Sequence, residues 1–251
     1  MTPMKTPVRS LATLLFLLLA FAAVAKDRAA SGAQVDVQAS LCSPPAQVRS
    51  ALKPKAKGAP INAWLFDDAS LSLFGKGLRI RLRDNHQGAE LTIKAANQDC
   101  AQLAPGTLPA GQGKCEYDSH GGSIAGALSL SRQVSATLAA ELVSGRTPLA
   151  SALSPAQIGF LESVPGAWPL PAGLRALGPI KVSSYAAKSY AIDFSNLPGG
   201  EQFIEISRKG ALRNADTMRL RMNQDLAKAN LTLCPDQTAQ AIIKLRALLK
   251  N

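Results

Sequence analysis

Hydrophobic and polar residues alternate along several short stretches of the chain, which is the pattern of β-strands with one buried face. The alternation is clearest over residues 34–41 and 78–83, where apolar side chains recur at every second position. Glycine, proline, asparagine and aspartate separate such stretches and predict turns between them. The pattern predicts further strands over residues 62–66, 90–94, 114–118, 180–185, 190–194, 202–208 and 218–223.

Other stretches have the composition of helices. Residues 46–52 follow a serine and two prolines, and Ser154 with Pro155 supplies an N-cap and a first helical residue for a helix to about Glu162. Residues 131–143 and 235–249 complete the predicted helices. Because no low-complexity linker divides this series, the sequence predicts one α+β domain over residues 26–251 that ends in a C-terminal helix.

The N-terminal 25 residues have the features of a signal peptide. Lys5 and Arg9 precede the apolar residues 11–24, and residues 23–25 read Ala-Val-Ala, a small-residue cleavage pattern. We therefore expect cleavage near Ala25 and an exported protein, either periplasmic or secreted. The apolar run is shorter than the roughly 20 residues that a bilayer crossing requires, so we expect no integral membrane segment in the mature chain.

All four cysteines follow this segment, and an exported protein meets an oxidising environment in which they can pair. Four cysteines allow three pairings. Cys100 and Cys115 flank a loop between predicted strands, while Cys42 and Cys234 precede the first and last helices. The expected disulfides are Cys100–Cys115 and Cys42–Cys234. A zinc site is disfavoured because the sequence has no Cys-x-x-Cys motif and only two histidines.

The chain is strongly basic, with a formal net charge of +11 that becomes +9 when Lys5 and Arg9 are removed with the signal peptide. Such an excess favours anionic partners, which include phosphates, nucleic acid and anionic cell surfaces. Aromatic residues make up only 5% of the chain, so base stacking is poorly supported and nucleic acid is a disfavoured partner. A phosphate-rich small molecule or another polyanion is the preferred class.

The positions of the charges refine this preference. Arg79, Arg81 and Arg83 alternate with apolar residues, so all three project from one face of their strand. Arg219 and Arg221 repeat the spacing. The guanidinium group matches the geometry of phosphate oxygens, and a curled sheet would bring such faces together around an anion. The alternative is that these are ordinary solvent-facing positions.

The same residues resemble a known family. The segments Trp-Leu-Phe-Asp-Asp at 64–68, Gly-Leu-Arg-Ile-Arg at 77–81, Glu-Leu-Thr-Ile-Lys at 90–94 and Lys-Cys-Glu at 114–116 are similar to the first half of a CYTH domain. The second half is similar through Lys181, Asp193 and the Phe-Ile-Glu segment at 203–205. This family, also called the triphosphate tunnel metalloenzymes, includes adenylate cyclases, RNA triphosphatases and tripolyphosphatases.

The resemblance implies an antiparallel, eight-stranded β-tunnel with flanking helices, in which basic side chains hold a chain of phosphates and carboxylates hold Mg²⁺ or Mn²⁺. Together with the charge pattern, it nominates as phosphate-binding residues Arg79, Arg81, Arg83, Lys94, Lys181, Arg219 and Arg221. The corresponding candidate metal ligands are Asp36, Glu116, Asp118, Asp193 and Glu205.

The sequence departs from the family at both of its acidic pairs. On the first strand, the family's Glu-x-Glu-x-Lys corresponds to residues 36–40, so Gln38 replaces an acid and Ser40 replaces the lysine. Later, Ser207 replaces the second acid of the pair that begins at Glu205. Three hypotheses follow: a metal-dependent triphosphatase or polyphosphate hydrolase, a polyanion-binding protein without turnover, and a structural or interaction protein whose tunnel charges pair internally.

Overall fold

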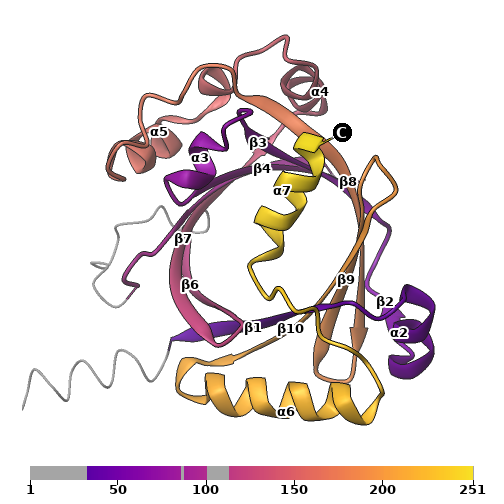
Figure 1. Ribbon diagram of the computed structural model, residues 1–251. Coiled ribbons are helices and arrows are strands. Elements are labelled where there is room, and N and C mark those ends of the chain that lie inside the picture. Colours follow the sequence, from indigo (N-terminus) through magenta and orange to yellow (C-terminus); the bar gives the residue numbers. More distant parts are fainter. Residues whose placement is uncertain (1–32, 86–87, 101–112, 251) are drawn as a thin grey trace, which may run out of the picture.

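The computed structural model describes residues 33–85, 88–100 and 113–250, and its strands form a ring (Figure 1). The signal-peptide prediction for residues 1–25 lies outside the described residues. The strands are β1 (Gln34–Leu41), β2 (Lys55–Ala56), β3 (Ile61–Asp67), β4 (Leu78–Asn85), β5 (Gly88–Ala96), β6 (Gly113–His120), β7 (Ser123–Val134), β8 (Arg175–Ala187), β9 (Tyr190–Asn196) and β10 (Gln202–Ala211).

Nine of these strands close on themselves in the order β8-β3-β4-β5-β7-β6-β1-β10-β9, because β9 also pairs with β8. The short strand β2 pairs with β8 outside the ring. All neighbours are antiparallel except β1 and β6, which run parallel. The expected tunnel is therefore confirmed in its general form, but the closed sheet has nine strands and mixed direction where eight antiparallel strands were expected.

The tunnel forms because most strands carry an apolar face that packs outward under helices. Leu78, Ile80 and Leu82 of β4 are fully buried in a cluster with helix residues such as Leu142 and Leu161. A second cluster packs β1, β9 and β10 against the outer helix at the bottom of Figure 1. Since successive residues of a strand point to opposite faces, the polar positions of these strands are directed into the ring.

The α-helices are α2 (Pro45–Leu52), α3 (Ser72–Gly75), α4 (Ala136–Ser144), α5 (Pro155–Glu162), α6 (Ala215–Lys228) and α7 (Gln240–Lys250), with 3₁₀ turns at Leu149–Ala152 and Leu212–Asn214. The prediction for α5 is confirmed, including a capping box in which Ser154 and Gln157 bond each other's backbone N–H groups. Gln157 also donates to the carbonyl of Leu91 at 3.1 Å, which attaches α5 to β5.

Two predictions of element type were wrong, and the helix predicted over residues 235–249 begins only at Gln240. Residues 218–223 lie in helix α6, because Met218, Met222 and Leu226 recur every four residues and bury one helical face. Residues 131–134 belong to strand β7, and the helix after it begins at Ala136, where the Ser135 hydroxyl accepts a hydrogen bond from the Leu138 N–H.

Helix α7 lies inside the ring of strands (Figure 1). Its residues Leu245 and Leu248 are buried against Leu65 of β3 and against Leu177 and Ile180 of β8. The tunnel thus contains an apolar wall beside its polar ones, and the C-terminal helix covers that wall.

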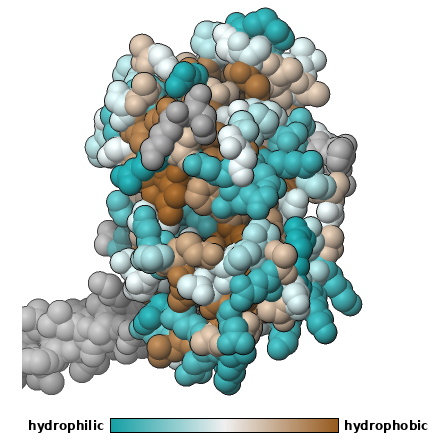
Figure 2. All heavy atoms as spheres, turned by 45° about the vertical axis from the view of Figure 1, so that its right-hand side comes forward, coloured by the Kyte–Doolittle hydropathy of each residue, from teal (hydrophilic) through white to brown (hydrophobic). Residues whose placement is uncertain are grey.

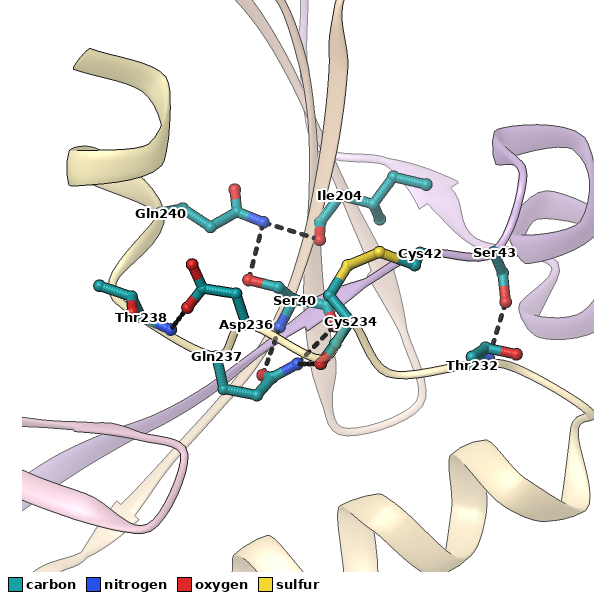
Figure 3. The surroundings of a disulfide bond; sticks show 10 residues. All are labelled: Ser40, Cys42, Ser43, Ile204, Thr232, Cys234, Asp236, Gln237, Thr238 and Gln240. Carbon is teal, nitrogen blue, oxygen red and sulfur yellow. Dashed lines mark hydrogen bonds between the residues drawn. A yellow bond between two sulfur atoms is a disulfide. The ribbon is translucent and has the colours of Figure 1, made fainter. Parts of the chain in front are cut away.

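Both predicted disulfides are confirmed: Cys42 is bonded to Cys234, and Cys100 to Cys115. The first joins the end of β1 to the segment that leads into α7 (Figure 3). A short antiparallel bridge between Leu41 and Leu233 and a hydrogen bond from the Cys234 N–H to the Ser40 carbonyl lie beside it. The start of the C-terminal segment is therefore fixed to the sheet.

The outer surface is mixed in character. Hydrophilic residues dominate the lower part of the face shown in Figure 2, where α6 lies. Leu220 of α6 and Ile124 of β7 are the large hydrophobic side chains exposed among the described residues. No helix in the described part of the chain has the length and apolar character needed to cross a bilayer.

Candidate functional site

The ring and α7 enclose a polar cavity of about 550 Å³. The cations that line it are Arg79, Arg81, Arg83, Lys94, Lys114, Lys209 and Lys244. The acids that line it are Asp36, Glu90, Glu116, Asp118, Asp193 and Glu205. The charges of these described residues nearly balance when all are ionised, so their individual environments decide what the cavity can bind.

The three arginines of β4 form one wall of the cavity. They point inward because the alternate residues Leu78, Ile80 and Leu82 pack outward. Burial, together with repulsion from the neighbouring cations Arg83 and Arg79, lowers the pKa of Arg81 to about 9, against the attraction of Glu90 and Asp193. The Arg81 Nε is buried and has no hydrogen-bond partner among the described residues. The wall therefore holds positive charge that the tunnel's own acids leave poorly compensated.

Lys94 and Asp118 form the closest ion pair of the cavity. The Lys94 Nζ donates to Asp118 Oδ2, and Arg79 Nη2 lies 3.9 Å from the same oxygen. Burial lowers the pKa of Lys94, which the partnership with Asp118 partly offsets. The Asp118 carboxylate is thus already in contact with two cations.

Glu116 is also held by two cations. Lys114 Nζ and Lys209 Nζ lie 2.9 Å and 3.1 Å from its two carboxylate oxygens. Although partial burial opposes ionisation, the hydrogen bonds from both lysines lower the pKa of Glu116. Glu116 is therefore an ionised carboxylate whose oxygens are both engaged.

On the opposite wall, Asp193 of β9 and Glu205 of β10 are direct cross-strand neighbours. Burial, together with repulsion from Asp193, Asp36 and Asp118, raises the pKa of Glu205 to about 7, against the attraction of Lys244. The Asp193 Oδ1 accepts a hydrogen bond from the Ser184 hydroxyl at 2.6 Å. At neutral pH this acidic pair carries less than two full negative charges.

Lys244 brings a cation to this acidic pair from α7. Its Nζ donates to the Ser195 hydroxyl at 2.8 Å, and Ser195 precedes the end of β9. Burial lowers the pKa of Lys244, while Glu205 and Asp193 raise it and Arg81 and Arg83 lower it. The ammonium group is therefore influenced by both the acidic pair and the arginine wall.

Comparisons with known proteins identify the fold. No protein-family model and no curated protein matches the sequence. A solved structure of a candidate adenylyl cyclase from Hippeastrum, described as having a dominant triphosphatase activity, is 14% identical with a TM-score of 0.56, covering 84% of this chain and 95% of that one. A candidate adenylate cyclase from Bacillus halodurans is 13% identical with a TM-score of 0.52, covering 82% of this chain and 95% of that one.

The chain has a CYTH-like fold. The resemblance seen in the sequence is thereby confirmed at the level of the fold, because these neighbours share the closed sheet at low sequence identity. The quoted motif at residues 64–68 has a structural part in this CYTH-like chain: Asp67 is buried, and its carboxylate accepts hydrogen bonds from the N–H groups of Asp68, Leu73 and Phe74.

Three of the nominated phosphate-binding residues lie away from the CYTH-like cavity. Lys181 is exposed on β8, while its neighbours Ile180 and Val182 face the cavity. Arg219 and Arg221 lie on the outer helix α6, where Arg219 pairs with Asp216 at 3.2 Å. The period of two that nominated them does not apply to a helix.

Sequence reasoning missed three lining residues that matter. Lys209 follows Glu205 and Ser207 at every second position of β10, so the strand pattern could have identified it. His120 ends β6, and burial lowers its pKa below the usual range. Lys244 could not have been found, because nothing in the sequence indicates that its helix enters the tunnel.

The acids of the CYTH-like tunnel do not fit a divalent metal centre. Mg²⁺ in phosphate-binding sites is held by one or two available carboxylates together with waters and the substrate phosphates. Among the described residues no group of three or more carboxylate, histidine or cysteine side chains is arranged to hold one. Asp118 and Glu116 are engaged by lysines. Burial raises the pKa of Asp36, and its Oδ1 has no hydrogen-bond partner within the described part of the chain. The remaining adjacent carboxylates, Asp193 and Glu205, lie near the Lys244 ammonium group, and the pKa of Glu205 is raised, so the expected Mg²⁺ or Mn²⁺ finds no fully available carboxylate pair.

Proposed function

We propose that this protein binds triphosphate, polyphosphate or a similar polyanion in its tunnel. The observation that carries the proposal is the wall of Arg79, Arg81 and Arg83, three inward arginines on one strand that repel one another. A phosphate chain beside them would supply the missing negative charge and accept hydrogen bonds from guanidinium groups such as that of Arg81.

Lys94 adds to this surface, since it is opposite Arg79 in the register of β4 and β5. Together the four cations lie on two adjacent strands, so an extended anion can contact several of them at once. The triphosphatase activity described for the Hippeastrum neighbour is consistent with a phosphate ligand, although that neighbour shares only the fold.

The alternative is a structural protein whose tunnel charges pair internally, and part of the cavity supports it. Asp118 and Glu116 do form ion pairs with lining lysines. The arginine wall argues the other way, because Arg81 is buried between Arg79 and Arg83 on β4, and both of these like charges lower its pKa. We therefore prefer polyanion binding to a purely structural role.

We propose binding without rapid hydrolysis. Metal-dependent cleavage of a phosphoanhydride uses carboxylates that hold the ion beside the phosphates. Here Gln38 and Ser207 line the cavity where the family has acids, and two of the remaining acids, Asp118 and Glu116, are paired with lysines.

We also propose that the protein functions after export, in the periplasm or outside the cell. Two disulfides suit an oxidising compartment, and all four cysteines are paired. N-terminal sequencing of the mature protein should begin near Lys26, and a mature protein that begins at Met1 would contradict export by cleavage.

The function is tested by calorimetric titration of the purified protein with inorganic tripolyphosphate, nucleoside triphosphates and longer polyphosphate, combined with a phosphate-release assay. We expect saturable binding of tripolyphosphate or polyphosphate, weaker binding of monophosphate because fewer cations are contacted, and little phosphate release. No binding of any of these anions would contradict the proposal, and rapid metal-dependent release would establish the enzyme hypothesis instead.

A further inference from the structure

Helix α7 places a positively charged side chain near Asp193 and Glu205, two of the acids that the family resemblance assigned to a metal. Lys244 lines the cavity, and its Nζ is held at 2.8 Å by the Ser195 hydroxyl. Ser195 lies two residues from Asp193 on the cavity face of β9, and Asp193 is the cross-strand neighbour of Glu205, so the ammonium group lies near both acids. Both acids attract it. One end of the tunnel's acidic wall therefore faces a cation of the chain itself.

The position of Lys244 is fixed by contacts along the whole C-terminal segment. Gln237 and Gln240 both donate to Ser40 of β1, and Gln240 also donates to the Ile204 carbonyl of β10 at 2.9 Å (Figure 3). The disulfide of Cys42 and Cys234 lies a few residues earlier. On the other side of Lys244, Leu245 and Leu248 are buried in the apolar wall.

A divalent cation and Lys244 compete for the same acids. An ion placed between Asp193 and Glu205 would lie beside the ammonium group and be repelled by it, and in a buried site this repulsion is poorly screened. The arginines Arg81 and Arg83 add to that repulsion, since they act on Lys244 from the opposite wall. Phosphate oxygens, in contrast, would find the ammonium group and the arginines facing them.

We propose that Lys244 takes the place of a divalent metal in this tunnel, so that the tunnel binds a phosphate chain without Mg²⁺ or Mn²⁺. The inference rests on the proposed function and deepens it, because it assigns the third side of the anion site to α7. A lysine in place of the metal also accounts for Gln38 and Ser207 at positions where the family has acids, since fewer acids are needed in a tunnel that holds no metal ion.

The test is a titration of the full mature chain with inorganic tripolyphosphate, once in EDTA and once with Mg²⁺ premixed with the ligand. We expect the wild type to bind in EDTA and to gain less than about threefold from Mg²⁺. Lys244→Ala should lose about ten- to hundredfold in EDTA, the effect of one charge-assisted contact. Lys244→Arg should retain most of the affinity.

Arg246→Ala is the matched control, because Arg246 lies on the same helix and is exposed. Arg246→Ala should bind tripolyphosphate as tightly as the wild type does. This result would show that affinity depends on the charge at position 244 and not on the total charge of α7. Circular dichroism and thermal unfolding of each variant establish whether it folds. If Lys244→Ala does not fold, the comparison of the wild type in EDTA and in Mg²⁺ still decides whether the tunnel needs a divalent metal to bind tripolyphosphate.

A second readout uses Mn²⁺ alone, without phosphate. The wild type should bind it weakly, and Lys244→Ala should bind it at least tenfold more tightly, because Glu205 and Asp193 then lack their cation. Tripolyphosphate binding that requires Mg²⁺ in the wild type would overturn the inference and leave the proposed function intact. Absence of binding with and without Mg²⁺ would overturn both.

Discussion

At the scale of residues, the tunnel is lined by charged groups, and burial shifts the pKa values of several of them. Arg81 and Glu205 show this from both sides, since burial lowers the pKa of the cation to about 9 and raises that of the acid to about 7. Both shifts favour the neutral form and measure how poorly each charge is compensated within the tunnel.

The shift of Glu205 predicts how stability depends on pH. Because its pKa is higher in the folded protein than the ordinary 4.5, the folded state binds the proton more tightly than the unfolded state. Its contribution is fully present below about pH 4.5 and is lost as the pH rises through about 7, a loss of about 1–3 kcal/mol in the free energy of unfolding. Lys244 opposes this shift, while Asp193, Asp36 and Asp118 support it.

The measurement is urea unfolding of wild type, Glu205→Gln and Glu201→Gln between pH 5 and pH 8. The Glu205→Gln variant should lose less stability over this range than the wild type, because it has no carboxyl group to ionise at that position. Glu201 is exposed just before β10, so Glu201→Gln should retain the wild-type pH dependence. Parallel curves for wild type and Glu205→Gln would refute the assigned environment of Glu205.

At the scale of elements, α7 lies inside the tunnel, and its apolar face holds it in place. Leu245→Ala should lower the free energy of unfolding by about 2–5 kcal/mol, since it removes a buried side chain between α7 and strands β3 and β8. Leu220→Ala on α6 is the control: Leu220 is 54% exposed and should change stability by less than about 0.5 kcal/mol. Chemical denaturation that gives equal values for the two variants would mean that α7 is not packed in the tunnel.

The elements also show how far the sequence could predict the fold. Strand β1 and strand β4 followed directly from alternation, because a strand with one apolar face needs no distant information to be recognised. Helix α6 did not, since its short arginine pattern resembles a strand over six residues and only the spacing of Met218, Met222 and Leu226 indicates a helix. The two disulfides were predictable because their cysteines lie at the ends of predicted elements.

Only part of the candidate site was predictable from the sequence. Arg79, Arg81 and Arg83 face the cavity as the period of two requires. Lys244 was beyond prediction because the entry of α7 depends on contacts with residues far away in the sequence, such as Ser40 and Leu65. The pairing of Asp118 with Lys94 depends on the strand order, since β7 lies between β5 and β6 in the sheet although it follows both in the chain.

At the scale of the whole molecule, one closed sheet separates two kinds of surface. Apolar residues face outward under α4, α5 and α6, and charged residues face an enclosed cavity that α7 completes. The excess of positive charge in the sequence is distributed over the outside as well, so net charge alone would attract anions weakly and without selection. Selective anion binding therefore depends on the inward arginines rather than on net charge.

The most direct test is a calorimetric titration of wild type, of the double variant Arg79→Ala and Arg81→Ala, and of Arg175→Ala with inorganic tripolyphosphate. Arg175 is exposed at the start of β8 and serves as the control for charge outside the tunnel. The account predicts that the double variant stays folded and loses at least tenfold, and on the order of a hundredfold, in affinity, while Arg175→Ala binds as the wild type does. Equal affinity of the double variant and the wild type would contradict the account, because tripolyphosphate would then bind somewhere other than the arginine wall.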